Sequence, residues 1–189
     1  RKMIPVFTAA GHRVIVPDMV GFGRSDKFLS KYDYSYKHHI DVIKELVRRL
    51  DLKEATFFGQ DWGGLVGLRV VAEMPDLFAR IVVSNTGMVA RAGISAWLFE
   101  NIVKFMVWWN APVTFDELKA AADQALELEE PSPLDGARMF LKWMAHSYYA
   151  EDMDVAAIIS TFGRIDLSEA EIRAYNAPYP SGEYKSGAH

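Results

Sequence analysis

The stretch that most constrains the fold of this chain is residues 59–64, with the sequence GQDWGG. The order glycine, variable residue, nucleophile, variable residue, glycine predicts a sharp turn from a strand into a helix. The central residue of such a turn has a strained backbone, and its neighbours must lack bulk. Serine usually occupies the centre of this nucleophile elbow, and here the residue is Asp61.

The aspartate at the centre of the elbow changes the expected chemistry. A serine needs a base to remove its proton as it attacks, whereas an aspartate carboxylate is already ionised at neutral pH. A carboxylate is a poor nucleophile toward an amide or ester carbonyl, but it can displace a leaving group from a saturated carbon. Asp61 therefore predicts an alkyl-ester intermediate and a substrate that carries a halide or a strained epoxide oxygen.

Apolar periodicity around the elbow predicts alternating strands and helices. Strands are predicted at residues 14–16, 56–58 and 81–83, and helices at residues 1–10, 36–50 (with Ser35 as N-cap) and 65–72. Gly63, Gly64 and Gly67 predict close packing of the last helix. Short connections imply right-handed crossovers and a parallel sheet, with residues 14–16 as a buried strand. Active sites of such sheets lie at the carboxyl ends of the strands, where Asp61 falls.

From about Met88 the sequence pattern predicts helices alone. Capping-box patterns begin at Thr114 and Ser168, and between them residues 135–149 carry apolar side chains at helical spacing. We interpret this stretch as a lid inserted after a strand. The predicted organisation is a partial α/β core at residues 1–87, a helical cap at 88–175 and a segment returning toward the core at 176–189.

Composition excludes several classes of partner. The net charge of −4 and the absence of a Lys/Arg run argue against nucleic acid, and the absence of cysteine excludes disulfides and thiolate metal sites. Residues 96–109 are too short and too interrupted by polar side chains to span a membrane. We expect a cytoplasmic monomer. The chain begins without Met, in what reads as a helix tail, so we also expect an internal fragment of a longer protein.

With these residues placed, the chain resembles the haloalkane dehalogenases of the α/β-hydrolase superfamily over essentially its whole length. The resemblance rests on the elbow, on residues 16–27 (VPDMVGFGRSDK) and on residues 175–180 (YNAPYP) followed by Tyr184 and Lys185. Epoxide hydrolases share the elbow, but the other two stretches are more similar to dehalogenases. The resemblance implies an α/β-hydrolase fold with a partial parallel sheet and an inserted all-helical cap.

The resemblance also implies roles for individual residues. Asp61 matches the nucleophile, and Trp62 matches the tryptophan whose indole N–H binds the departing halide and whose backbone N–H helps to hold the oxyanion. Counting back from the Ser168 capping box gives Trp143 as the second halide-binding tryptophan. The family's triad histidine falls beyond this chain, as does its His-Gly-x-Pro turn. Asn85 occupies the place of a triad glutamate, so the acid is expected outside the chain too.

The implied reaction is hydrolytic dehalogenation of a small apolar haloalkane to an alcohol and a halide, with water as co-substrate and no metal or organic cofactor. Two alternatives stay open. An epoxide hydrolase would use the same nucleophile, with Tyr148 or Tyr149 protonating the opening oxygen. A non-catalytic, lidded fragment would only bind small apolar ligands.

Other conspicuous side chains have simpler interpretations. We interpret Asp18 as a residue that fixes the loop after the first predicted strand, and His146 as a hydrogen-bonded structural histidine. Trp97, Trp108 and Trp109 are interpreted as packing residues of the lid.

Overall fold

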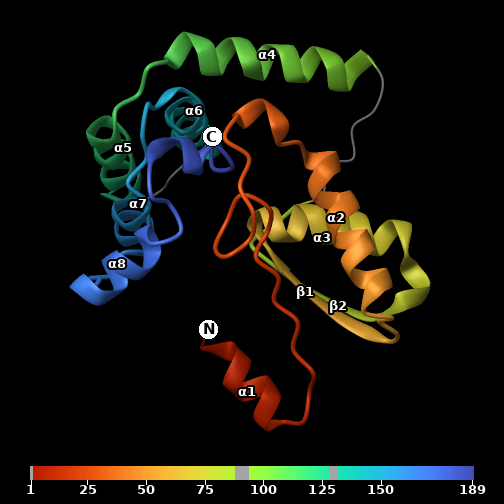
Figure 1. The fold of residues 1–189 in the computed structure, drawn as a ribbon. Coiled ribbons are helices and arrows are strands. Elements are labelled where there is room, and N and C mark those ends of the chain that lie inside the picture. The colour runs from red at the N-terminus through yellow and green to blue at the C-terminus, as the bar shows by residue number, and fades with distance from the viewer. Residues whose placement is uncertain (1, 88–93, 128–131) are drawn as a thin grey trace.

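The elbow is the point where a strand becomes a helix without an intervening residue. The computed structural model describes residues 2–87, 94–127 and 132–189. Strand β1 (Ala55–Gln60) leads directly into α3 (Asp61–Glu73), and the chain returns as β2 (Phe78–Ser84) (Figure 1). The two strands pair in parallel, with Gln60 opposite Ser84 at their carboxyl ends. The predicted order of strand, helix and strand around the elbow is confirmed.

Helix α2 (Tyr36–Arg49) packs against α3 beside the sheet. It begins at the predicted N-cap, because the side chain of Ser35 accepts a hydrogen bond from the backbone N–H of His38 at 3.1 Å. The helices bury a cluster made of Ile40, Val47, Val66 and Val70. This cluster is the hydrophobic core of the part of the fold that carries the elbow.

The predicted strand at residues 14–16 is wrong. Helix α1 (Met3–Ala9) is followed by an extended segment that pairs with neither β1 nor β2, the two strands of the described residues. The side chain of Val16 is 66% exposed. A β-branched run becomes a strand only when a neighbour supplies backbone hydrogen bonds, and none does so here. Figure 1 shows this segment leading away from α1.

The described residues from 94 to 176 contain helices and no strand, and we call them the helical segment. The helices are α4 (Ile94–Asn110), α5 (Phe115–Glu127), α6 (Pro133–Tyr149), α7 (Val155–Gly163) and α8 (Glu169–Asn176). Both predicted capping boxes form, with Thr114 bonded to Glu117 and Ser168 bonded to Glu171. The helical segment has its own buried cluster, built from Val107, Val113, Leu118 and Ala145.

The interpretation of three tryptophans as packing residues is wrong. Trp97, Trp108 and Trp109 lie on α4 with 64%, 58% and 72% of their surface exposed. Helix α4 lies along one edge of the structure and packs mainly on α6 (Figure 1). The side chains on one face of α4 are therefore buried, and those on its other faces point outward. No helix among the described residues is long and apolar enough to cross a membrane.

The chain exposes much more surface than its mass requires. Its accessible area is 13,500 Å², whereas a compact protein of 21.3 kDa exposes about 9,100 Å². Part of the excess lies on the sheet. Phe57 packs against Gly67 of α3, so the next residue, Phe58, and its partner Val82 point to the opposite face, where each is nearly half exposed. The face of the sheet away from α3 is therefore uncovered in this chain.

Glycines allow the strand and the helix of the elbow to approach closely. A Cβ atom on Gly59 would lie 2.9 Å from the Cα of Gly64, and a Cβ atom on Gly64 would overlap the side chain of Thr86. A Cβ atom on Gly67 would overlap the ring of Phe57. The space around Gly63 is open, so the predicted close packing is confirmed at Gly64 and Gly67 and wrong at Gly63.

Adjacent glycines in the elbow should therefore respond in opposite ways to alanine. We expect Gly64→Ala to lower the free energy of unfolding by about 1–3 kcal/mol, because the new methyl group meets Thr86. The control Gly63→Ala should raise it by up to about 1 kcal/mol, because alanine favours the helix and the site is open. Urea denaturation of both variants measures the difference, and equal effects would contradict the packing described.

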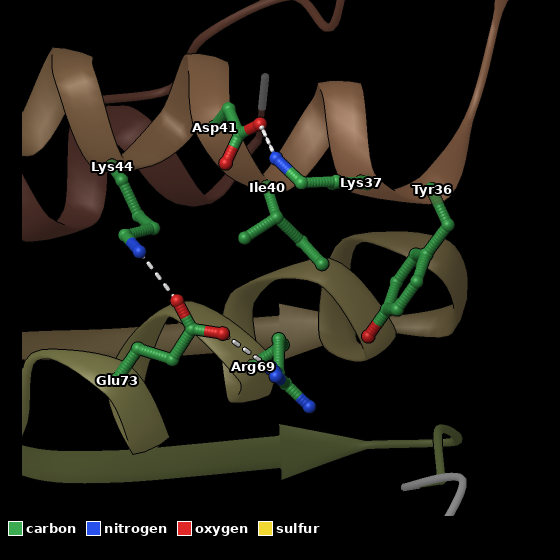
Figure 2. A pocket seen from close by; sticks show the side chains of 7 residues that line it. All are labelled: Tyr36, Lys37, Ile40, Asp41, Lys44, Arg69 and Glu73. Carbon is green, nitrogen blue, oxygen red and sulfur yellow. Dashed lines mark hydrogen bonds and ion pairs between the residues drawn. The ribbon is translucent and has the colours of Figure 1, made fainter.

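An ion-pair network joins α2 to the end of α3. Glu73 pairs with Lys44 of α2 and, at 2.6 Å, with Arg69 of its own helix (Figure 2). Two hydrogen bonds lower the pKa of Glu73 from 4.5 to about 2. The bond from Lys44 has the larger effect, and the bond from Arg69 comes second. A carboxyl with a lowered folded-state pKa stabilises the fold fully above its unfolded pKa and loses this effect as pH falls through the folded value.

The stabilisation by Glu73 should consequently depend on pH. We expect Glu73→Gln to lower the melting temperature by a constant amount from pH 7 down to about 4.5, and the difference should shrink and vanish as pH approaches about 2. The control is Glu54→Gln, since Glu54 makes no ion pair in the described residues. A gap for Glu73→Gln that persists unchanged at pH 2 would argue against the network.

Candidate active site

The backbone of Asp61 is strained and is held in place by the residues that follow β2. Its φ angle is +48°, in the left-handed region that costs a non-glycine residue about 1–3 kcal/mol. The N–H of Asp61 donates to the carbonyl of Asn85 at 3.3 Å, and the hydroxyl of Thr86 donates to the carbonyl of Asp61 at 2.8 Å. The end of β2 therefore supports both backbone polar groups of the residue at the elbow.

The side chain of Asp61 points into solvent. It is exposed, and no hydrogen-bond donor or cation among the described residues pairs with its carboxylate. Asp61 is the first residue of α3, and the preceding Gln60 makes no side-chain cap. Apart from the N–H of Asp61, which donates to Asn85, the N–H groups of the first helical turn, including that of Trp62, are thus open to an oxyanion.

Trp62 lies beside Asp61 on the first turn of α3. Its side chain is 63% exposed and makes no ring contact with the other described aromatic residues. Trp62 is therefore not a packing residue of the buried clusters. Its indole N–H remains available to an anion next to the carboxylate.

Trp143 lies in the helical segment and not beside the elbow. Its ring packs edge-to-face on Phe162 of α7, with centroids 5.5 Å apart, and it borders the buried cluster of the helical segment. Neither a hydrogen bond nor a ring contact joins Trp143 to Asp61 or Trp62. The structure brings together two of the three predicted site residues.

Tyr148 contacts Lys31, the first residue of the short 3-10 helix Lys31–Asp33. The amine of Lys31 donates to the backbone carbonyl of Tyr148 at 2.7 Å and lies 3.9 Å from the centre of its ring. Burial raises the pKa of the Tyr148 phenol, and nearby Tyr32 contributes to the increase. Tyr149 packs edge-to-face against Tyr148. A phenol that holds its proton more tightly is a weaker acid for opening an epoxide.

Two of the simpler interpretations are confirmed. His146 is buried, and its Nδ1 lies 2.8 Å from the carbonyl oxygen of Val113. The carboxylate of Asp18 accepts a hydrogen bond from the backbone N–H of Arg24 at 2.9 Å, which fixes the loop. In residues 2–87, 94–127 and 132–189, no three side chains of His, Asp or Glu are grouped so that they could hold a metal ion.

Two residues next to the site were missed by sequence reasoning. Thr86 was not singled out, although it follows a strand that was predicted to end beside the elbow. Tyr36 was assigned to a helix, but its hydroxyl donates to the carbonyl of Leu65 on α3 at 2.8 Å. The parallel order of the two strands is the signal that would have pointed to Thr86.

A hollow of about 430 Å³ lies between α2 and α3, away from Asp61 and Trp62. Figure 2 shows that its walls carry the ion pairs described above together with the ring of Tyr36. The hollow therefore contains the contacts that join the two helices and not the carboxylate of Asp61.

Comparison with known proteins gives consistent relatives. The family described as alpha/beta hydrolase fold matches residues 1–160. A haloalkane dehalogenase of Mycobacterium marinum is 53% identical over 189 residues, which cover 100% of this chain and 50% of that protein. One of Psychrobacter cryohalolentis is 39% identical over 188 residues, covering 100% and 48%. The chain spans about half the length of these relatives.

A solved structure supports the same assignment. The tetrameric haloalkane dehalogenase of Paraglaciecola agarilytica is similar with a TM-score of 0.67 and 32% sequence identity. The similarity covers 99% of this chain and 48% of that one. The sequence and the arrangement of elements thus lead to the same fold.

The strain at Asp61 can be measured by comparing glycine with alanine. We expect Asp61→Gly to be about 1 kcal/mol more stable to urea than Asp61→Ala, because only glycine adopts a φ of +48° without strain. At Asp41, inside α2, the same pair should show the reverse order by about 1 kcal/mol, because alanine is the better helix former. If the alanine variant were the more stable one at both positions, residue 61 would not be left-handed in solution.

Proposed function

Because the chain belongs to the α/β-hydrolase fold family, we propose that its elbow supplies the nucleophile of a hydrolytic dehalogenation, with Asp61 as that nucleophile. The observation that carries the proposal is an unpaired carboxylate at a strained strand-to-helix turn. The enzymes named haloalkane dehalogenase that are 53% and 39% identical to this chain support the carbon–halogen bond as the target.

In the first step, a carboxylate oxygen of Asp61 attacks the carbon that bears the halogen. The new C–O bond forms as the carbon–halogen bond breaks, and the bonding electron pair leaves with the halide. The indole N–H of Trp62 donates to that halide, which stabilises charge where it develops. The product is an alkyl ester on Asp61 and a free halide ion.

In the second step, water attacks the carbonyl carbon of the ester. The triad histidine that the family resemblance implies, which is not among the residues of this chain, would take a proton from the water, and the backbone N–H of Trp62 supports the oxyanion that forms. Collapse of this intermediate releases the alcohol and restores the Asp61 carboxylate. The whole reaction consumes one haloalkane and one water and forms one alcohol, one halide and one proton.

Several finer parts of the hypothesis stay predictions. These are the division into a core at residues 1–87, a cap at 88–175 and a return segment at 176–189, the role of Trp143 as second halide donor, and the cytoplasmic location. The solved relative is a tetramer, so the expected monomer is also open. A small apolar haloalkane is the proposed substrate.

The epoxide hydrolase alternative is less well supported. It needs a phenol that gives up its proton, and the pKa of Tyr148 is raised by burial. The same side chain is engaged with Lys31. The exposed elbow is the observation that favours the non-catalytic alternative, since a halide site works best when water is excluded.

The chain should form a covalent ester with a reactive bromoalkane. We expect intact-mass measurement after incubation with 1-bromobutane to show one added butyl group on Asp61 and release of one bromide per chain. Asp61→Asn should show neither, because an amide is not a comparable nucleophile. An unchanged mass of the unsubstituted chain, or turnover of an epoxide without any bromide release, would overturn the proposed reaction.

Loss of the halide donor should slow the first step. We expect Trp62→Phe to reduce the rate of bromide release about 10–100-fold, since a hydrogen bond to a charged group contributes about 1.5–3 kcal/mol. The matched variant is Trp143→Phe. An equal loss there supports a second donor, whereas an unchanged rate leaves Trp143 as a packing residue.

A further inference from the structure

Two contacts from α2 hold α3, the helix that begins with the nucleophile. Near the first turn of α3, the hydroxyl of Tyr36 donates to the carbonyl of Leu65 at 2.8 Å. At the last residue of α3, the carboxylate of Glu73 pairs with Lys44. Figure 2 shows both side chains of α2 pointing across the hollow toward α3.

The spacing of the contacts is the same on both helices. Tyr36 and Lys44 are eight residues apart on α2, and Leu65 and Glu73 are eight residues apart on α3. Eight helical residues span about 12 Å, so the two contacts match only when α2 and α3 run in the same direction without a relative shift. Between them, Ile40 is buried against the apolar core. The pair of contacts therefore fixes the position of α3 along its own axis.

Leu65 is one helical turn from the nucleophile. Residues four apart lie on the same face of a helix, about 6 Å apart along the axis. A rotation of α3 at Leu65 therefore turns the side chain of Asp61 with it. Displacement reactions require the attacking oxygen to be aligned with the carbon and the leaving group, and small misplacements cost large factors in rate.

The Tyr36 hydrogen bond is not needed to satisfy the backbone of α3. A carbonyl oxygen has two lone pairs, and inside a helix one of them already accepts the N–H four residues later. Removal of the hydroxyl therefore leaves no buried acceptor without a partner. Tyr36 is itself 44% exposed, so its ring is not a core element. The hydroxyl is thus free to act on orientation rather than on folding.

We propose that Tyr36 is a positioning residue, which acts through the Leu65 carbonyl to set the rotation of α3 and so to aim the Asp61 carboxylate at the substrate carbon. The Lys44–Glu73 pair is the second fixed point, which prevents α3 from sliding. The proposal rests on the proposed function for the identity of the reacting carboxylate. It assigns a new role to Tyr36, which lies outside the elbow on α2.

The test compares Tyr36→Phe with the unsubstituted chain in single-turnover ester formation with 1-bromobutane. We expect the maximum rate to fall at least 10-fold while the half-saturating concentration changes less than 2-fold and the melting temperature is retained. The control is Lys37→Ala, because Lys37 lines the same hollow but, among the residues that the structure describes, forms an ion pair only with Asp41 of its own helix. This variant should keep the full rate.

A second measurement does not depend on ester formation. Hydrogen exchange of the backbone amides in residues 59–66 should be at least 5-fold faster in Tyr36→Phe than in Lys37→Ala. An unchanged exchange rate, or an ester rate equal to that of the unsubstituted chain, would overturn the role of Tyr36. If the unsubstituted chain forms no ester, the proposed function is wrong, and the exchange data alone then decide whether Tyr36 orders the first turn of α3.

Discussion

The candidate site depends on the hydrogen bonds between the backbone of Asp61 and the residues at the end of β2. The left-handed turn would relax without them, because a φ of +48° is unfavourable for an aspartate. Asn85 and Thr86 reach Asp61 only because β1 and β2 pair in parallel and end together, with Gln60 opposite Ser84. The same Thr86 side chain fills the space that a Cβ on residue 64 would need, so strand pairing also dictates the glycine there.

Features encoded within a few residues were predictable from the sequence. The elbow and the capping boxes at Thr114 and Ser168 each depend on residues no more than five positions apart, and all of them form. The strand at residues 14–16 depends on a distant neighbour, and the prediction failed because no described strand pairs with it. Burial of Trp109 depends in the same way on what packs against α4, so its apolar sequence alone misled.

The candidate site shows the same division. Asp61 and Trp62 are adjacent in the chain, so the elbow pattern alone was enough to place them together. Trp143 was placed on a helix by counting from a capping box, but that count carries no information on where its ring points, and the ring lies on Phe162. The contact of Tyr36 with α3 could not be predicted from the sequence, because it depends on the relative position of two helices.

The two proposed steps make different demands on the protein. Ester formation needs an aimed carboxylate, and the described residues supply this through the end of β2 and through α2. Halide binding needs a dry site, since an indole N–H in water already has a partner. Trp62 is 63% exposed here, and the accessible surface far exceeds that of a compact chain of this mass. The orientation of the Asp61 carboxylate therefore depends on the elbow, the end of β2 and α2. Exclusion of water requires further surface to cover Trp62.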